Sequence, residues 1–317
     1  MVKFRDQLRA NLKDEIPNDV INLLPAGYQT LSDVLILNLK DEVIPYKEKI
    51  GNATLKLVPS ISSVWMRTGT ISGEFRKPTG LKHLAGERKT EIIHKENNLK
   101  YKFDFTKIMF AKGNITERRY LPKLVENKET IVDMFAGIGY FSLGIAKFAN
   151  PNQIFSIELN PVAYNYLKEN IKLNKLSDKI RPIHGDCKEE VPVLAKKGIK
   201  AERIIMGILP TPYEYIKAAL TVIKQKELEI QTNIQEFVEK ATETTKYDVY
   251  DRVQKPITNS IIHFEGVSLG KDIETIYNEF SQHAKNYEYR CCLLAFRFVK
   301  SFGPKMYHLV LDIAIGK

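Results

Sequence analysis

The sequence has few cysteines and lacks a long hydrophobic run. Its 317 residues include three cysteines, of which Cys291 and Cys292 are adjacent. This count and spacing exclude a disulfide framework and a structural zinc site, and they are typical of a protein from a reducing compartment. No apolar stretch approaches the roughly 20 residues that a membrane-spanning helix needs, and the charged N-terminal stretch lacks the apolar core of a signal peptide. We therefore expect a cytoplasmic protein with no membrane partner and no metal.

Acidic residues are in the minority. The chain carries 48 Lys and Arg against 38 Asp and Glu, which gives a formal net charge of +10. A basic balance is common among proteins that bind nucleic acid, although a generally lysine-rich composition also produces it. The length suits one large or two medium domains with a substantial core. Composition thus favours a globular protein with a nucleic-acid partner.

The clearest local motif is a glycine turn between an apolar strand and a helix. The stretch "ETIVDMFAGIGYFSLGIAKFA" contains a predicted buried strand, then the small residues Ala136, Gly137 and Gly139, then apolar residues that share one helical face. Small residues let the backbone approach a ligand closely, and the free N–H groups of a helix start favour electron-rich groups. The stretch predicts the first half of a dinucleotide-type α/β unit.

Acidic residues follow three of the predicted strands. Asp133 precedes the glycine turn, Glu158 ends "NQIFSIELN", and Asp186 ends "IRPIHGDCKE". A carboxylate at the end of the second strand can accept hydrogen bonds from both hydroxyls of a ribose, and the third is placed to accept from an adenine amino group. A nicotinamide enzyme would satisfy these facts too, but the dinucleotide pattern requires a third glycine where this chain has Ser142. Asp133 suits the cationic tail of S-adenosylmethionine, so this cofactor is favoured over a nicotinamide and over a ligand-free core.

The chain is predicted to contain two domains. Residues 1–100, with strands such as "DVLILNL" and a hairpin near Asn97-Asn98, indicate a small α+β domain. Residues 101–317 continue the α/β pattern and finish with two antiparallel strands around Gly303-Pro304, which predicts a doubly wound, Rossmann-type sheet of the class I methyltransferase-like kind. The first domain also carries basic residues that either follow a phosphate backbone or form a solvated face: Arg76, Lys77, Lys82, Arg88, Lys89 and Lys95.

Five segments together resemble one group of tRNA-modifying enzymes. They read "KIMFAKGNITERR", "VDMFAGIGYFSLGIAK", "ENIKLNKL", "IIMGILP" and "VKSFGPKMYHLVLDI". They are similar to segments of the archaeal and eukaryotic enzymes of wybutosine synthesis and of the related tRNA guanine-N1 methyltransferases. The resemblance covers most of residues 60–220 and 257–317. It implies S-adenosylmethionine as the donor substrate and tRNA as the partner, and we favour a monomer.

Two positions bear on which group is transferred. The methyltransferases resemble F-S-P-R-x-x-x-E-R, whereas "FAKGNITER" has Gly113 at the arginine position. After the fourth strand the methyltransferases resemble Asn-Leu-Pro, whereas "GILP", from Gly207 to Pro210, is closer to the wybutosine enzymes. The resemblance therefore implies transfer of the 3-amino-3-carboxypropyl group to C7 of 4-demethylwyosine in tRNA(Phe), next to the anticodon. Guanine-N1 methyl transfer at the same nucleotide is the alternative, and a non-catalytic tRNA-binding protein with a vestigial site is a third reading.

The resemblance also implies roles for individual residues. Arg118 matches an arginine that holds the ligand and suits its carboxylate, while Ala111 replaces a ligand-binding serine and so removes one hydrogen bond. Glu117 either matches the general base of the methyltransferases or is a helix-start acid paired with a neighbouring arginine. The predicted catalytic residues are Glu117, Gly207 and Pro210, and the predicted cofactor-binding residues are Ala111, Arg118, Asp133, Phe135, Gly137, Glu158, Asp186 and Cys187.

A charged segment, residues 221–256, stands where the family turns quickly to its next strand. Its apolar residues recur at helical spacing and are Ile230, Ile234, Phe237 and Val238. It is either an extra tRNA contact or lid, or a charged surface excursion with no catalytic role. His263 and His308 lie in strand patterns, and we expect both to be core or substrate-adjacent residues and not metal ligands.

Overall fold

The computed structural model divides the chain into two compact units, Met1–Phe110 and Ala111–Lys317. The structure describes residues 2–69, 71–72, 77–228, 230–249 and 257–317. Arg76, one of the predicted basic residues of the first domain, lies outside the described residues, as does the side chain of Lys77. Within the described ranges, no helix is long and apolar enough to cross a membrane.

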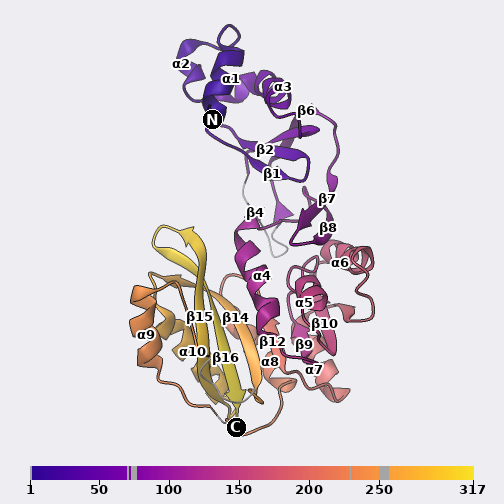
Figure 1. Ribbon diagram of the computed structural model, residues 1–317, viewed down its shortest axis with the longest axis vertical. Helices are drawn as coiled ribbons and strands as arrows, with labels where there is room; N and C mark the ends of the chain where they lie inside the picture. Colours follow the sequence, from indigo (N-terminus) through magenta and orange to yellow (C-terminus); the bar gives the residue numbers. More distant parts are fainter. Residues whose placement is uncertain (1, 70, 73–76, 229, 250–256) are drawn as a thin grey trace. The chain divides into compact units, whose positions relative to one another are not determined.

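The first unit combines helices with a small mixed sheet (Figure 1). Its four-stranded sheet has the order β1 (Gln29–Leu31), β2 (Val34–Asn38), β3 (Ser63–Arg67) and β6 (Leu81–Gly86). Only the β2–β3 pair in this order is parallel. The remaining elements are α1 (Phe4–Leu12), α2 (Asn18–Ile21), η1 (Asp41–Tyr46), α3 (Lys47–Leu57), β4 (Ile71–Ser72), β5 (Lys77–Pro78), β7 (Glu91–Glu96) and β8 (Leu99–Asp104).

The α+β character predicted for the N-terminal part is confirmed. Leu8 and Leu12 of α1, together with Ile50 of α3, pack on Leu35 and Leu37 of the sheet to form a core of its own. The predicted boundary near residue 100 falls within β8, whose antiparallel partner β7 belongs to the same unit. The division in the structure therefore comes after this hairpin.

The second unit is built on an eight-stranded sheet. The strand order is β11 (Ile180–His184), β10 (Gln153–Glu158), β9 (Thr130–Asp133), β12 (Arg203–Met206), β14 (Ser260–Leu269), β16 (Met306–Gly316), β15 (Arg290–Gly303) and β13 (Lys246–Asp248). The first five strands are parallel, and each of the last three is antiparallel to the strand before it in this order. This is the predicted doubly wound sheet closed by an antiparallel hairpin.

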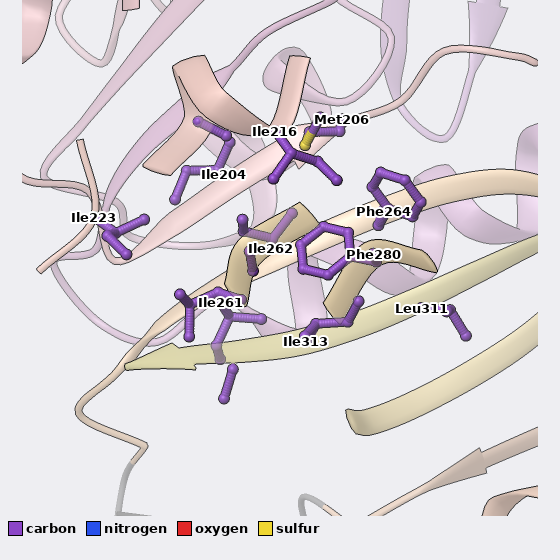
Figure 2. Packing of buried hydrophobic residues seen from close by; sticks show 14 of the residues in the cluster. Ile204, Met206, Ile216, Ile223, Ile261, Ile262, Phe264, Phe280, Leu311 and Ile313 are labelled. Carbon is purple, nitrogen blue, oxygen red and sulfur yellow. The ribbon is translucent and has the colours of Figure 1, made fainter. Parts of the chain in front are cut away.

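Helices cover both faces of this sheet. On one face Ile204 of β12 and Phe264 of β14 pack against Ile216 and Phe280 of the covering helices, as Figure 2 shows. The helices on that face are α7 (Cys187–Lys196), η3 (Tyr213–Tyr215), α8 (Ile216–Thr221), α9 (Ile234–Glu243) and α10 (Ile273–Lys285). The opposite face carries η2 (Lys112–Asn114), α4 (Ile115–Leu124), α5 (Ser142–Phe148) and α6 (Pro161–Leu173).

The charged segment after α8 is packed onto the sheet where the structure describes it. Phe237 and Ala241 of α9 are buried in the core, and β13 pairs with β15 at the edge of the sheet. Ile234, Phe237 and Val238 belong to α9 as the spacing predicts, whereas Ile230 precedes the helix. Residues 229 and 250–256 of the segment lie outside the described residues.

The strand order locates the candidate site. The first strand of the sheet, β9, lies between β10 and β12, so the chain moves to one side for β10 and β11 and then returns to the other side for β12 and β14. Ligands of open α/β sheets bind at the carboxyl ends of the strands where this reversal occurs. Asp133, Glu158 and Gly207 end or directly follow β9, β10 and β12 at that edge.

Candidate active site

The glycine turn after β9 has the geometry that its sequence requires. Gly137 and Gly139 have φ values of 57° and 99°, a backbone conformation that residues other than glycine rarely adopt. A Cβ at Gly139 would also lie 2.7 Å from Cγ of Leu143. The turn is bound to the second strand through the amide of Ala136, which donates to the carbonyl of Ile157 at 2.9 Å. The backbone is therefore held close to the end of β10.

Glu158 at the end of β10 is oriented by two backbone donors. Its Oε2 accepts from the amide of Gly137 at 2.7 Å, and its Oε1 accepts from the amide of Asn160 at 2.8 Å. The side chain is partly exposed, and each oxygen has a second lone pair for a ligand hydroxyl. Burial raises the pKa of Glu158 to about 7, although the two amides oppose the shift. The structure thus places the carboxylate beside the glycine turn.

Asp133 is the centre of a buried hydrogen-bond chain. Its Oδ2 accepts from the hydroxyl of Ser142 at 2.6 Å, and Ser142 also contacts the hydroxyl of Ser156 at 2.7 Å. Burial raises the pKa of Asp133 to about 6, and the Ser142 hydrogen bond opposes this shift. Ser142 stands where a dinucleotide site would have its third glycine. Its hydroxyl gives the physical reason for that departure, because a glycine there would leave Asp133 without this donor.

The end of β11 contributes a helix cap and a buried thiol. Asp186 caps α7 by accepting from the amide of Lys188 at 2.8 Å. Cys187 is buried, and its burial raises the thiol pKa to about 12, so it is neutral and unreactive at physiological pH. Phe135, after β9, meets the ring of Tyr215 edge-on at a centroid distance of 4.9 Å. Asp186 and Phe135 are partly exposed, whereas Cys187 is packed in the core; the adenine contact of the first two stays a prediction.

The connector before β9 holds its two predicted ligand residues against each other. Nη1 of the buried Arg118 donates to the carbonyl of Ala111 at 3.0 Å. Ala111 contributes its backbone carbonyl to this contact, and its side chain has no hydroxyl to offer a ligand. A Cβ at Gly113 would lie 2.7 Å from Cδ of Lys300. The space beside Gly113, the position that matches the arginine of the methyltransferase sequence pattern, is thus filled by the Lys300 side chain from β15.

Glu117 is buried and paired with an arginine that is distant in sequence. Its exposed fraction is 2%, and its Oε1 and Oε2 accept from Nε of Arg297 at 3.0 and 3.1 Å. Nη1 of Arg297 also donates to Oδ2 of Asp312 at 2.8 Å. This geometry suits the ion-pair reading of Glu117, with a partner from β15 in place of a neighbour in the helix. A role as general base stays a prediction.

The ion pair extends across the antiparallel part of the sheet. Nδ1 of His263 lies 2.9 Å from Oδ1 of Asp312, and both residues are fully buried. Burial alone would raise the pKa of Asp312, but the charges of Arg297 and His263 hold it well below its usual range. The carboxylates of Asp312 and Glu117 raise the pKa of Arg297, although burial alone would lower it. Glu117, Arg297, Asp312 and His263 thus link α4 to β15, β16 and β14.

Gly207, directly after β12, lies close to another buried acid, Glu265. A Cβ at Gly207 would lie 2.7 Å from Cε2 of Phe141 and 3.8 Å from Cδ of Glu265. Glu265, on β14, accepts through Oε2 from Nε2 of His308 at 3.1 Å. Pro210 follows at an exposed position. The small residue at 207 is therefore required by its neighbours, and it brings Glu265 close to the strand end.

Sequence reasoning missed Glu265, Arg297 and Asp312. Each is the single Asp, Glu, Lys or Arg in a mostly apolar strand segment, in "IIHFEGV", "LLAFRFV" and "LVLDIAI", and that pattern is the signal that could have found them. His263 and His308 were expected to be core or substrate-adjacent, and each is buried and hydrogen-bonded to a carboxylate. In the part of the chain that the structure describes, no three His, Cys, Asp or Glu side chains are grouped to hold a metal ion.

Comparisons with known proteins cover nearly the whole chain. The sequence model of the TRM5/TYW2 methyltransferase domain matches residues 92–255, and that of the TYW2 N-terminal domain matches residues 8–90. The chain is 31% identical over 314 residues to the tRNA(Phe) (4-demethylwyosine(37)-C(7)) aminocarboxypropyltransferase of Pyrococcus horikoshii, a match that covers 99% of this chain and 98% of the relative. It is 32% identical over 315 residues to the tRNA (guanine(37)-N(1))-methyltransferase Trm5b of Methanocaldococcus jannaschii, with 99% and 77% covered.

A solved structure agrees with the sequence matches. The crystal structure of Pyrococcus horikoshii TYW2 in complex with MeSAdo has a TM-score of 0.75 and 27% sequence identity, and the match covers 98% of this chain and 99% of that chain. These comparisons confirm the predicted fold class and the resemblance found in the sequence.

Proposed function

Because the chain belongs to the TRM5/TYW2 methyltransferase family, we propose that it is a tRNA aminocarboxypropyltransferase. It transfers the 3-amino-3-carboxypropyl group of S-adenosylmethionine to C7 of 4-demethylwyosine in tRNA(Phe), next to the anticodon. The observation that carries the proposal is coverage, since the chain spans 98% of the aminocarboxypropyltransferase relative and 77% of the methyltransferase relative. The match of residues 8–90 to the TYW2 N-terminal domain supports the same assignment.

The residues at the carboxyl edge of the sheet fit S-adenosylmethionine. Glu158 accepts from the ribose hydroxyls, and Asp186 accepts from the adenine amino group beside Phe135. The turn at Gly137 leaves the backbone accessible to the ligand, and Asp133 below it favours the cationic tail. The fit rests on the partly exposed carboxylate of Glu158, which Gly137 and Asn160 hold at the ligand edge of the sheet.

The choice of transferred group is a matter of position. A sulfonium has three carbons open to attack, and the one held in line with the nucleophile is transferred. Arg118 holds the carboxylate of the methionine tail, and the carbonyl of Ala111 orients its guanidinium. Holding the tail by its carboxylate directs the γ-carbon toward the base, which lies against Gly207 and Pro210.

Guanine-N1 methyl transfer is the second candidate. One observation favours it: Lys300 brings a positive charge beside Gly113, near the place where the methyltransferases have an arginine. The site therefore has a cation there despite the glycine. The two candidates differ in the donor carbon and in the acceptor base.

Isotopic labelling of the donor tests the proposed function. With tRNA that carries 4-demethylwyosine, S-adenosylmethionine labelled in its carboxyl carbon should transfer the label to RNA, and methyl-labelled donor should not. Methylthioadenosine should accumulate in place of S-adenosylhomocysteine. Arg118→Ala should slow transfer more than it weakens adenosine binding, because it misplaces the reacting carbon. Transfer of the methyl label alone, to unmodified guanosine, would establish the second candidate in its place.

The first unit contributes a tRNA contact. Lys89 is engaged in ion pairs with Asp33 and Glu87, whereas Lys82, Arg88 and Lys95 are exposed. Changing these three exposed residues to Gln should weaken tRNA binding and lower its salt dependence by about one unit of slope per lost phosphate contact. Affinity for S-adenosylmethionine should not change.

The matched control also removes three positive charges, by changing the exposed lysines Lys196, Lys197 and Lys200 of the second unit to Gln. It alters the net charge in the same direction without touching the first unit. Equal losses of tRNA affinity in both variants would show that general charge, and not the first unit, is responsible.

A further inference from the structure

Glu265 is a buried acid whose carboxylate is only half satisfied. Its exposed fraction is 1%, and Oε2 accepts from Nε2 of His308 at 3.1 Å. Its Oε1 is also buried, and no donor among the described residues hydrogen-bonds to it. A buried carboxylate oxygen without a donor costs free energy, so its retention calls for an explanation.

The burial of two other acids in this part of the protein, Glu117 and Asp312, has a structural explanation. Glu117 and Asp312 share the guanidinium of Arg297, which donates to both carboxylates. Their charges are compensated inside the protein. Glu265 is held by a histidine, which orients the carboxylate and donates to Oε2, and Oε1 has no donor among the described residues.

Glu265 also lies near Gly207, where the proposed function places the base that receives the transferred group. Its Cδ is 3.8 Å from the position that a Cβ at Gly207 would occupy. Its partner His308 is directly opposite Lys300 in the β15–β16 register, and Lys300 packs on Gly113. These contacts connect Glu265 to Gly113 and Gly207, the two glycines that separate this chain from the methyltransferase pattern.

The transfer reaction itself leaves a proton to be removed. When C7 of the base forms its bond to the γ-carbon, the bond between that carbon and sulfur breaks, and its electron pair remains on the neutral thioether. C7 then carries both its hydrogen and the new substituent, and the ring holds the positive charge. Loss of the C7 proton returns the electrons of the C–H bond to the ring, so the reaction needs a proton acceptor near C7.

We propose that Glu265, oriented by His308, is this proton acceptor, taking the C7 proton on Oε1. The proposal rests on the proposed function, because only attack by a ring carbon leaves a C–H proton to remove. The proton forms a neutral carboxylic acid at Glu265 and is released to water when the product leaves.

The charges around Glu265 keep it ready to accept a proton. Burial alone would raise its pKa, but the hydrogen bond from His308 and the charges of His308, His263 and Lys300 together lower it. The carboxylate is therefore ionised at neutral pH. These groups come from β16, β14 itself and β15, the strands that surround the carboxylate.

Glu265→Gln tests the proposal because the amide keeps the size and removes the acceptor. Single-turnover transfer of carboxyl-labelled donor to tRNA with 4-demethylwyosine should slow by about 10²- to 10⁴-fold. Affinity for S-adenosylmethionine and for tRNA should stay within about twofold. Glu265→Asp should retain more activity than Glu265→Gln. Wild-type rates in Glu265→Gln, or equal losses of rate and cofactor affinity, would overturn the proposal.

The pH profile separates a proton acceptor from a merely structural acid. His308→Gln removes a group that lowers the pKa of Glu265, so the acidic limb of the single-turnover rate should move to higher pH. An acidic limb that stays in place would overturn the proposal, because a structural pair would change stability without moving the profile.

Glu129→Gln is the matched control. Glu129 is also a buried acid, but it pairs with Arg203 at the opposite, amino-terminal end of the strands, at 2.9 Å. The variant should lose thermal stability and keep its transfer rate per folded molecule. Wild-type protein is assayed in parallel with carboxyl- and methyl-labelled donor. A wild type that transfers only methyl label contradicts the proposed function, whereas a wild type that transfers carboxyl label beside a fast Glu265→Gln variant contradicts only the role of Glu265.

Discussion

The acids at the ligand edge of the parallel strands and the buried acids of the antiparallel half have different partners. In the parallel half, burial raises the pKa of Asp133 to about 6 and of Glu158 to about 7. In the antiparallel half, neighbouring cations lower the pKa of Asp312 and Glu265 despite their burial. Asp133 and Glu158 have only hydroxyls and amides as hydrogen-bond partners, whereas Asp312 and Glu265 have an arginine or a histidine.

This difference indicates what each half is for. An acid with neutral partners gains most from a ligand that brings donors or positive charge, so the parallel half is suited to bind. An acid paired with an internal cation is already compensated, so the Glu117–Arg297–Asp312 group is suited to fix α4 on the sheet. Glu265 is intermediate, because it has a cationic environment and one oxygen without a donor.

The largest effect is expected from Arg297→Met. The change leaves the carboxylates of Glu117 and Asp312 buried without their cation, so the free energy of unfolding should fall by about 3–5 kcal/mol. Urea denaturation followed by circular dichroism measures it. Adding Glu117→Gln to this variant should restore part of the loss, because one of the two uncompensated charges is removed.

A loss below about 1 kcal/mol in Arg297→Met would break the comparison. Such a result would show that Glu117 and Asp312, like Asp133 and Glu158, do not need an internal cation for stability.

A smaller effect is expected from Glu158→Ala, and it should appear in binding and not in folding. Loss of the charge-assisted hydrogen bonds to the ribose should weaken S-adenosylmethionine by about 1–3 kcal/mol in calorimetry. The pKa of Glu158 is raised from 4.5 to about 7 in the folded protein, so ionisation is disfavoured by folding. Its effect on stability therefore becomes less favourable as pH rises between these values, and Glu158→Gln should not destabilise the protein at pH 8.

The pH dependence of binding sharpens the same prediction. The ribose hydroxyls need the ionised carboxylate, so affinity of the wild type should fall as pH drops through about 7. Glu158→Gln should bind weakly at every pH and lose this dependence. A wild-type affinity that is constant from pH 6 to pH 8 would show that the carboxylate does not contact the donor.

The sequence predicts the parallel half better than the antiparallel half, for a physical reason. The glycine turn, Asp133 and Glu158 depend on a strand, a turn and a helix that are close in the chain, so spacing alone indicates their geometry. Glu117 and Arg297 are 180 residues apart, and their contact depends on the docking of α4 and on the register of β15. No local pattern contains that information.

Gly113 shows a second limit of reasoning from one position. In the sequence, the glycine stands where the methyltransferase pattern has an arginine, and it suggests open space at that position. The space is filled by Lys300 of β15, whose position depends on the register in which β15 pairs with β16. Substitution of one residue by another is visible in a sequence, whereas the arrival of a distant side chain in the vacated volume is not.

The long separation between Glu117 and Arg297 also has a consequence for biosynthesis. A ribosome completes α4 well before it makes β15 and β16, the strands that supply Arg297 and Asp312. Until those last strands emerge, the carboxylate of Glu117 lacks its arginine partner, and α4 lacks this hydrogen-bonded contact with the sheet. Arg118 follows Glu117 directly in α4. The nascent chain therefore completes its proposed S-adenosylmethionine site only when β15 and β16 have been synthesised.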